Sequence, residues 1–295
     1  MRRDYELARK LANKAVKKAR KNNTSPYLPV LDTKYDSKSF FREVRAGLME
    51  LPVNRIVGTK ELSRTNAFAG NFMPLHGVDS EFAYKWSDLH DAVSSCGIRD
   101  AIKVYEFMHE YYVQEGNKRV SVSKYYKIDF ILAEVIRILP YRDGSDEVEA
   151  YYEYLDFYNV TKNYYLAFKK VGSYRKLAEL LGQNLTEQWN EDLLIDLKAA
   201  YFQFIKIFKA VTKMQNDFSI CDAFLTYVEK FTLESLLTDS DRKIKENIRI
   251  NKNELMGIET ETTETAVRPE KTFGIRGMLN GFRNTLSQNS LEFSE

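Results

Sequence analysis

Apolar residues recur at helical spacing along the first part of the chain. Leu7 and Leu11 are followed by alanines at the same four-residue interval, which predicts a helix with a narrow apolar stripe over residues 1–22. The next stretch, NNTSPYLPVLDTKYDSKSF, has two prolines and several turn-forming residues, a composition that is typical of a surface connection. We therefore expect an amino-terminal helix followed by a linker over residues 23–47.

Strand and helix patterns alternate over residues 48–142. LMELPVNRIVGT alternates like a strand, and SEFAYKWSDLHDAVSSCG has its large apolar residues at helical spacing, with Gly97 placed to end the helix. IRDAIKVYEF and EYYVQ resemble two strands joined by a tight connection, then a turn and a helix follow, and IDFILAEVIRILP is a last strand. Strand, helix, hairpin, helix and strand predict a compact α+β domain.

Helical periodicity dominates the rest of the chain. Five segments, from VEAYYEYLDFYNVTKNYYLAFKKV to SDRKIKENIRINKNELM, are separated by glycine, asparagine and aspartate, which predicts an all-α helical domain over residues 143–256. Residues 257–295 include the polar run IETETTETAVRPEK, so we expect a disordered tail with one short, weakly amphipathic segment. The predicted fold class is α+β, with an α+β domain followed by an all-α helical domain.

Composition and charge narrow the class of protein. The chain has 295 residues, 44% of them hydrophobic, and neither a long apolar run nor a secretory apolar segment at its start, so we expect a cytoplasmic protein with no membrane partner. Its net charge is +2, but nine Lys and Arg residues against two acidic residues fall within residues 1–21. Such a helix suits an acidic surface, a phosphate backbone or a partner helix, although a solvated charged face is the commoner meaning of a charge run.

A small basic turn joins the second hairpin strand to the next helix, in YYVQEGNKRVSVSKYY. We expect the strand to end at Gln114, Gly116 to let the backbone turn or approach a ligand, and Asn117 to cap a helix that begins at Lys118. Lys118 and Arg119 oppose the helix dipole at that end unless an anion is bound there. The pattern indicates phosphate binding, and the alternative is a capped helix with two solvated cations.

In the order of its elements, the segment from Leu51 to Leu139 resembles the amino-terminal domain of the ParB/sulfiredoxin superfamily. ELPVNRIVGTKELSR corresponds to the strand and arginine-containing loop of that family, Gly97-Ile98 and Ala101-Ile102 match its middle block, and GNKR falls on its glycine-rich basic box. The nucleotide phosphate-binding residues that this resemblance implies are Gly116, Asn117, Lys118 and Arg119, with Arg64 as the counterpart of the loop arginine.

The resemblance also implies a cofactor and a partner. The ligand would be a nucleoside di- or triphosphate, namely CTP, ATP or ADP, with or without Mg²⁺, because ParB proteins hydrolyse CTP, a serine kinase of this scaffold uses ADP, and sulfiredoxin uses ATP. Asn117 stands at the position of the sulfiredoxin cysteine, so sulfiredoxin chemistry is not implied, and no ENxxR box follows the last strand. The chain is also similar to the amino-terminal region of longer bacterial proteins that carry a basic-membrane-protein-type substrate-binding domain.

Glu115 is the candidate catalytic residue. A carboxylate beside bound phosphates could hold Mg²⁺ or accept a proton from a substrate. The alternative is that Glu115 ends its strand and pairs with Lys118 or Arg119. The three histidines have no metal-ligand spacing, so no metal site is expected in the chain itself.

Three functions follow from these observations. The leading hypothesis is a nucleotide-binding regulatory or scaffold protein; the second is an enzyme on the same scaffold, a small-molecule kinase or nucleotidase; the third is a partition-like DNA-binding protein. A homodimer is among the expected assemblies. Residues 173–198 have the outline of a helix-turn-helix, but the second helix carries four carboxylates before its first cation and would repel DNA. DNA binding is therefore assigned to the basic helix at residues 1–22 and is not favoured.

Overall fold

The computed structural model describes residues 2–98, 100–214 and 216–258, apart from the side chains of Arg2 and Arg64. Residues 1–258 belong to one compact unit, so the domain boundary placed between residues 142 and 143 stays a prediction. Nearly all of the tail predicted for residues 257–295 lies outside the described residues. Among the described helices, none combines the length and the apolar composition that a membrane span requires.

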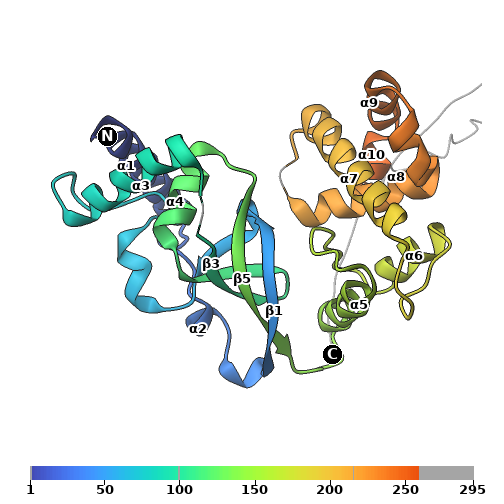
Figure 1. Cartoon of the computed structure of the whole chain (residues 1–295), viewed down its shortest axis with the longest axis horizontal. Coiled ribbons are helices and arrows are strands. Elements are labelled where there is room, and N and C mark those ends of the chain that lie inside the picture. Colours follow the sequence, from blue (N-terminus) through green and yellow to red (C-terminus); the bar gives the residue numbers. More distant parts are fainter. Residues whose placement is uncertain (1, 99, 215, 259–295) are drawn as a thin grey trace, which may run out of the picture. The chain divides into compact units, whose positions relative to one another are not determined.

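A five-stranded mixed sheet is the centre of the first half of the chain, and with the surrounding helices it gives the α+β class that the sequence predicts (Figure 1). The strands follow the spatial order β1-β5-β3-β4-β2. β1 is antiparallel to β5 and β3 is antiparallel to β4, whereas β3 and β5, and also β2 and β4, are parallel. The strands are β1 (Phe40–Pro52), β2 (Ile56–Thr59), β3 (Ile102–Phe107), β4 (Glu110–Glu115) and β5 (Phe130–Pro140).

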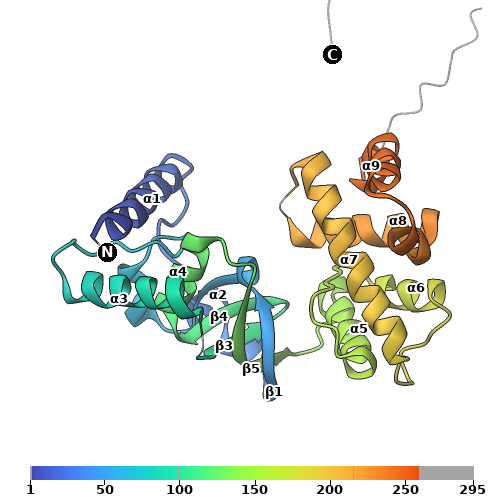
Figure 2. The ribbon, with the colours of Figure 1, turned by 45° about the horizontal axis from the view of Figure 1, so that its top comes forward.

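Helices of this half gather beside the sheet, where α3 contacts both α1 and α4 (Figures 1 and 2). α3 follows its local sequence signals. The hydroxyl of Ser80 accepts the N–H of Ala83 at 3.2 Å and caps the helix, and Gly97 ends it with a φ of 71°. The helices are α1 (Arg2–Lys21), α2 (Leu31–Lys34), α3 (Glu81–Cys96) and α4 (Asn117–Tyr126), with short 3-10 turns η1 (Ser37–Ser39), η2 (Val53–Arg55) and η3 (Leu62–Ala67).

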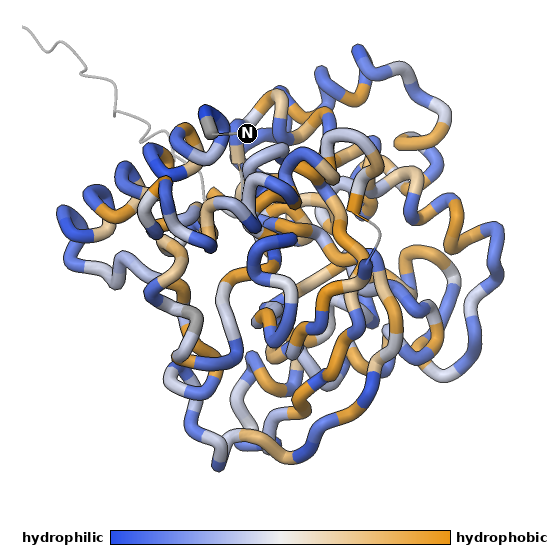
Figure 3. The backbone as a smooth tube through the Cα atoms, turned by 60° about the vertical axis from the view of Figure 1, so that its left-hand side comes forward, coloured by the Kyte–Doolittle hydropathy of each residue, from blue (hydrophilic) through white to orange (hydrophobic). Residues whose placement is uncertain are grey.

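α1 joins this core through a face beside the predicted stripe, because Leu7 and Leu11 of that stripe are 42% and 47% exposed. Tyr5, Ala8 and Ala12 are buried in a cluster with Trp86, and the Tyr5 and Trp86 rings meet edge to face at 5.5 Å. The Tyr5 hydroxyl also donates to the carbonyl of His76 at 3.0 Å. Figure 3 shows mainly hydrophilic residues along this helix, which starts at the label N. The basic face of α1 therefore stays in solvent while its small apolar residues hold it in place.

The linker predicted for residues 23–47 is wrong over much of its length. β1 already begins at Phe40, and the preceding segment is anchored, because Leu28, Val30 and Leu31 are buried and the carbonyl of Pro29 accepts the N–H of Thr59 at 3.0 Å. The physical reason is that the apolar residues on both sides of Pro29 pack into the core, where Val30 forms a bridge to Thr59 of β2. The residues of β1 before Leu48 were not predicted as a strand, because they are mostly exposed and do not show a clear alternation of apolar and polar residues.

The second half of the described chain consists of helices and loops, with no strand among residues 141–258. Its core is a large apolar and aromatic cluster that includes Tyr154, Phe157 and Phe204, each 1% exposed or less. The aromatic residues of the first helix thus serve packing. The helices are α5 (Asp146–Thr161), α6 (Ser173–Leu180), α7 (Glu191–Thr212), α8 (Asp217–Thr238), α9 (Asp241–Ile250) and α10 (Lys252–Leu255).

The first of these helices ends earlier than its sequence pattern predicts. Helical spacing continues to Val171, but α5 ends at Thr161 because Lys162 is left-handed, with a φ of 54°. The side-chain oxygen of Asn163 then accepts the N–H groups of Tyr165 and Leu166 at 3.2 and 3.1 Å. An asparagine that satisfies backbone donors locally favours a turn over another helical turn. This loop places the carbonyls of residues 164 and 165 in the interior.

A buried ion pair connects the sheet to α5. The Arg137 guanidinium on β5 donates to the Glu106 carboxylate on β3 at 2.6 Å, and both side chains are at most 6% exposed. The hydroxyls of Tyr151 and Tyr154, both on α5, lie 2.7 Å from Glu106 and 3.0 Å from Arg137. The backbone N–H of His109 donates to the other Glu106 oxygen at 2.8 Å. Both oxygens of Glu106 and two of the three guanidinium nitrogens of Arg137 thus have a polar partner close by, as a buried pair requires.

We expect Glu106→Ala to lower the free energy of unfolding by about 3–5 kcal/mol, because it leaves the Arg137 charge uncompensated in the interior. The measurement is urea denaturation followed by circular dichroism. The control is Glu229→Ala, which removes an exposed partner of Lys176 at 2.7 Å and should change stability by less than about 1 kcal/mol. Equal losses in the two variants would contradict a structural role for the buried pair.

Candidate functional site

The basic turn between β4 and α4 begins one residue earlier than the sequence predicts. Gly116 is the N-cap, with a left-handed φ of 107°, and α4 starts at Asn117, so the assignment of Asn117 as N-cap and Lys118 as first helical residue is wrong. The carbonyl of Gly116 accepts the N–H of Val120 at 3.1 Å. A glycine turns the chain here because a Cβ would lie 2.5 Å from Cγ2 of Ile102.

The cations of this turn have partners within the chain. Arg119 donates to the carbonyls of Asp100 and Ala101 at 3.0 and 2.6 Å, and the ammonium of Lys118 lies 4.6 Å from the centre of the Phe82 ring. Asn117 is buried, and its Oδ1 has no hydrogen-bond partner among the described residues. Arg64, the predicted loop arginine, belongs to η3, and its side chain lies outside what the structure describes. The guanidinium of Arg119 therefore serves first to fix the segment before β3.

Glu115, the candidate catalytic residue, is an exposed carboxylate at the end of β4. Its oxygens lie 3.4 Å from the ammonium of Lys103 and 3.6 Å from the guanidinium of Arg119, and its side chain is 61% exposed. This geometry matches the alternative in which the residue ends its strand and forms ion pairs.

A different location in the described chain has the properties of a ligand site. A cavity of about 530 Å³, here called the basic pocket, lies where η2 and the carboxyl end of α4 meet α7 and the first residue of α8. Cations outnumber carboxylates among its lining side chains, and several aromatic rings line it as well. The cations are Arg55, Lys124, Lys127, Lys206 and Lys209, the carboxylates are Asp129 and Asp217, and the aromatic residues are Phe130, Tyr165, Tyr201 and Phe202.

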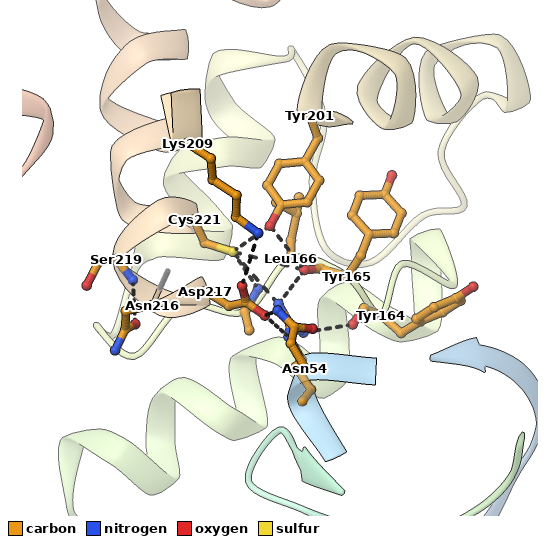
Figure 4. Close-up of polar contacts among 12 residues, drawn as sticks. Asn54, Tyr164, Tyr165, Leu166, Tyr201, Lys209, Asn216, Asp217, Ser219 and Cys221 are labelled. Carbon is orange, nitrogen blue, oxygen red and sulfur yellow. Dashed lines mark hydrogen bonds and ion pairs between the residues drawn. The ribbon is translucent and has the colours of Figure 1, made fainter. Parts of the chain in front are cut away.

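Arg55 is the buried cation of the basic pocket, with 6% of its side chain exposed. Its guanidinium donates to the carbonyls of Tyr164 and Tyr165 at 3.1 and 2.6 Å, and its Nε lies 3.4 Å from the Asp217 carboxylate (Figure 4). The amide of Asn54 donates to the same carboxylate oxygen at 2.6 Å. These bonds occupy Arg55 and neutralise Asp217, so the positive charge that a ligand would meet comes from the lysines.

Cys221 belongs to the same polar cluster (Figure 4), and its sulfur lies 4.0 Å from a terminal nitrogen of Arg55. Its sulfur is 3.1 Å from the hydroxyl of Tyr201 and accepts the N–H of Ala167 at 3.4 Å. Burial raises the pKa of the Cys221 thiol and also that of the Tyr201 hydroxyl, which keeps both groups protonated at neutral pH. A neutral, buried thiol is a poor nucleophile, so we assign Cys221 to packing.

Lys124 and Lys127, on the last turn of α4 and just after it, form no ion pair with any described residue. Lys124 lies 5.1 Å from the centre of the Phe72 ring, and partial burial lowers its pKa from 10.5 to about 8. Lys209, by contrast, is 3.9 Å from Asp217, and Lys206 is 3.3 Å from Asp241. The two lysines of α4 thus supply uncompensated positive charge beside the cavity.

The arrangement suits an anion that also has a flat apolar part. Phe130 and Phe202 approach edge to face at 5.6 Å, and Phe202 also contacts Tyr165 and Tyr201 at 5.6 and 5.7 Å. Aromatic faces bind planar rings by stacking, and ammonium groups bind phosphate or carboxylate. No cluster of three potential metal ligands occurs among the described residues.

Sequence reasoning did not find the basic pocket. Lys206 and Lys209 are three residues apart within α7, and this spacing places them on one helical face. Lys124 and Lys127 have the same spacing, but Lys127 is the left-handed residue just after α4. That signal is weak, because lysines near the carboxyl end of a helix also stabilise the helix dipole. The pocket combines segments that include some more than 70 residues apart in sequence. A local sequence pattern cannot predict that such segments come together.

Comparison with known proteins assigns the chain to no family. No protein-family model matches the sequence, and a search of curated proteins finds no significant match. The function must therefore be argued from the geometry of the basic pocket and the turn.

We expect Gly116→Ala to lower the free energy of unfolding by about 2–4 kcal/mol, because a left-handed alanine is strained and its Cβ collides with Ile102. The matched control is Gly172→Ala. Gly172 is also a left-handed N-cap, with a φ of 86°, but a Cβ there meets no atom within 4 Å, so the loss should be about 1–2 kcal/mol. Chemical denaturation measures both, and equal losses would contradict the close approach of Gly116 to Ile102.

Proposed function

We propose that the chain is a nucleotide-binding regulatory or scaffold protein and that the nucleotide occupies the basic pocket. The observation that carries the proposal is the pairing of Lys124 and Lys127, which have no carboxylate partner among the described residues, with the aromatic wall at Phe130 and Phe202. Phosphates would contact the lysines, and the base would stack on the rings. The volume of about 530 Å³ is within the range of small-molecule and cofactor sites.

The regulatory role follows from which segments line the pocket. Residues of η2 and of the segment that follows α4 come from the sheet half of the chain, whereas Tyr201, Lys206 and Asp217 come from helices of the second half. A ligand that contacts both sets would favour the arrangement in which they are together, because binding stabilises the form that binds. Occupancy could thereby be transmitted to whatever the helices contact.

We also propose that the sheet half is a ParB-like domain. The order α3, β3-β4 hairpin, α4, β5 supports this proposal, since it is the order on which the sequence resemblance rests. In that family the phosphates would lie at Gly116 to Arg119, the opposite end of α4 from Lys124. The turn is therefore the alternative location for the nucleotide. We favour the basic pocket because Arg119 is already bonded to two carbonyls.

The other two functions have less support. An enzyme would need a general base beside the ligand. Of the two carboxylates that line the basic pocket, Asp217 is paired with Arg55 and Asp129 is exposed, and Glu115 lies outside the pocket, exposed and ion-paired. DNA binding would use the basic face of α1, which remains in solvent, with Lys10, Lys14 and Lys17 exposed. Exposed lysines alone do not distinguish a DNA site from an ordinary solvated helix face.

We expect Lys124→Ala and Lys127→Ala each to weaken nucleotide binding about tenfold to hundredfold, since each removes a charge-assisted contact of roughly 1.5–3 kcal/mol. The assay is isothermal titration calorimetry with CTP, ATP and ADP, with and without Mg²⁺. Arg119→Ala should lower stability but leave affinity unchanged, and Lys14→Ala, an exposed lysine of α1, is the charge-matched control.

Each outcome of this series has a distinct meaning. Loss of affinity in Arg119→Ala alone would move the nucleotide to the turn. Absence of binding to any nucleotide by the wild type would overturn the proposed function. Phosphate release above background by the wild type would favour the enzyme.

We expect the affinity for nucleotide to fall as pH rises above about 8. The free protein has a Lys124 pKa of about 8, whereas a bound phosphate favours the ammonium and raises this pKa, so binding takes up a proton above pH 8. Affinity should fall about twofold between pH 7 and 8, where the charged fraction of Lys124 falls from about nine tenths to about half, and then decrease by up to about tenfold per pH unit. Titration calorimetry from pH 7 to 9.5 measures this.

The control for the pH series is Lys124→Arg, whose guanidinium stays charged throughout this range. Its affinity should be independent of pH between 7 and 9.5. The range begins at pH 7 because the terminal phosphate of the nucleotide has lost most of its second proton there. A wild-type affinity that does not change between pH 8 and 9.5 would show that Lys124 does not contact the anion.

A further inference from the structure

β1 is a long edge strand whose outer edge is open. It spans thirteen residues, pairs with β5 on one side, and has no strand on its other side among the described residues (Figure 2). Residues 41–48 are exposed on both faces apart from the half-buried Ala46, and they include the apolar side chains of Phe41, Val44 and Leu48, which are 53%, 36% and 61% exposed. An open edge presents unpaired backbone donors and acceptors that can pair with another strand.

Two irregularities limit the part of β1 that can accept a new strand. The pairing with β5 shifts between Phe40 and Arg42 and again between Arg45 and Gly47. Between these bulges the strand is regular over residues 42–45, with Arg, Glu, Val and Arg in succession. Bulges of this kind disrupt the ladder and blunt an edge, so a partner strand must be matched to the short regular segment.

The charges in this segment have no partners in the described part of the chain. Glu43 lies opposite Ile138 of β5, and Arg45 lies opposite Ile136, so their cross-strand neighbours are apolar. Neither side chain forms an ion pair with another described residue. A carboxylate and a guanidinium two residues apart on one face of the strand are a pattern that an antiparallel copy of the same strand can match.

We propose that β1 pairs with β1 of a second copy of this chain, antiparallel, around a two-fold axis that passes between the two Val44 residues. A two-fold axis perpendicular to a sheet keeps each side chain on the same face of the sheet. Such an axis passes midway between one residue and the same residue of the second copy, so that residue lies directly opposite its own copy. Within the regular segment, a centre at Arg42, Glu43 or Arg45 would oppose like charges. With the axis at Val44, Glu43 of each copy lies opposite Arg45 of the other copy, which gives two pairs of opposite charge.

The apolar side chains fit the same register. Val44 meets its copy at the axis, and Leu48 lies opposite Phe40 of the second copy, just beyond the bulges. Phe41 contacts Tyr141, which is itself 51% exposed, at 5.4 Å, and this aromatic pair would border the new interface. The interface joins two sheets into one of ten strands, and its self-complementary charges identify the partner as a second copy rather than an unrelated strand.

The register is tested by cysteine cross-linking of the full chain. The background is Cys96→Ser, because Cys96 is exposed and Cys221 is buried. Val44→Cys should give a covalent dimer with a short bifunctional thiol reagent, because the two cysteines face each other across the axis. Leu48→Cys and Ala46→Cys should cross-link much less. Efficient cross-linking at Ala46 but not at Val44 would overturn the proposed register.

The charge pairs are tested by sedimentation velocity over a range of concentrations. Glu43→Arg and Arg45→Glu should each raise the dimer dissociation constant by about tenfold, because each change replaces two attractive pairs by two repulsive ones. The double variant Glu43→Arg, Arg45→Glu restores both pairs and should associate like the wild type. Glu187→Arg, an exposed carboxylate in the loop before α7, is the control. A wild type that stays monomeric at every concentration would overturn the proposal.

Discussion

Burial of two arginines is the constraint on which the rest of this structure depends. Arg137 is held between Glu106 and two tyrosines of α5, and Arg55 is held by two loop carbonyls and Asp217. A buried guanidinium without such partners would be strongly destabilising. Both arginines come from the sheet half. The carbonyls and the carboxylate that hold Arg55 come from the helical half, whereas the charge partner of Arg137 is Glu106 on β3 and its tyrosine contacts come from α5. The need to satisfy these two charges therefore fixes which surfaces of the two halves meet and creates the basic pocket beside Arg55.

α4 illustrates how one helix can present cations at both ends for different reasons. At its amino end, Lys118 and Arg119 oppose the helix dipole, and that conflict is reduced because Arg119 reaches back to the carbonyls of residues 100 and 101. At its carboxyl end, Lys124 agrees with the dipole, yet partial burial lowers its pKa. The carboxyl end of α4, where Lys124 forms no ion pair with any described residue, is thus the end that faces the basic pocket. Local dipole arguments alone point to the other end.

Local signals predicted the elements whose ends are set by local chemistry. α3 was predicted from its spacing and from Gly97, and the α+β class followed from the order of strands and helices. Prediction failed where tertiary packing decides: Leu28 and Leu31 turn an apparent linker into buried chain, and the early part of β1 has no apolar period because it is exposed on both faces. The basic pocket could not be predicted, since Lys124 and Lys206 come together only after folding.

Arg55 and Arg119 share a feature with a consequence for how this sequence can diverge. Both bond mainly to backbone carbonyls, of residues 164 and 165 in one case and 100 and 101 in the other. A carbonyl is present whatever the side chain, so selection on these contacts acts on the arginine alone and leaves the residues it touches free to change. No compensating substitution exists for a lost arginine, and covariation cannot mark the contact. Homologues could retain both contacts while having only the two arginines in common in the segments that form them.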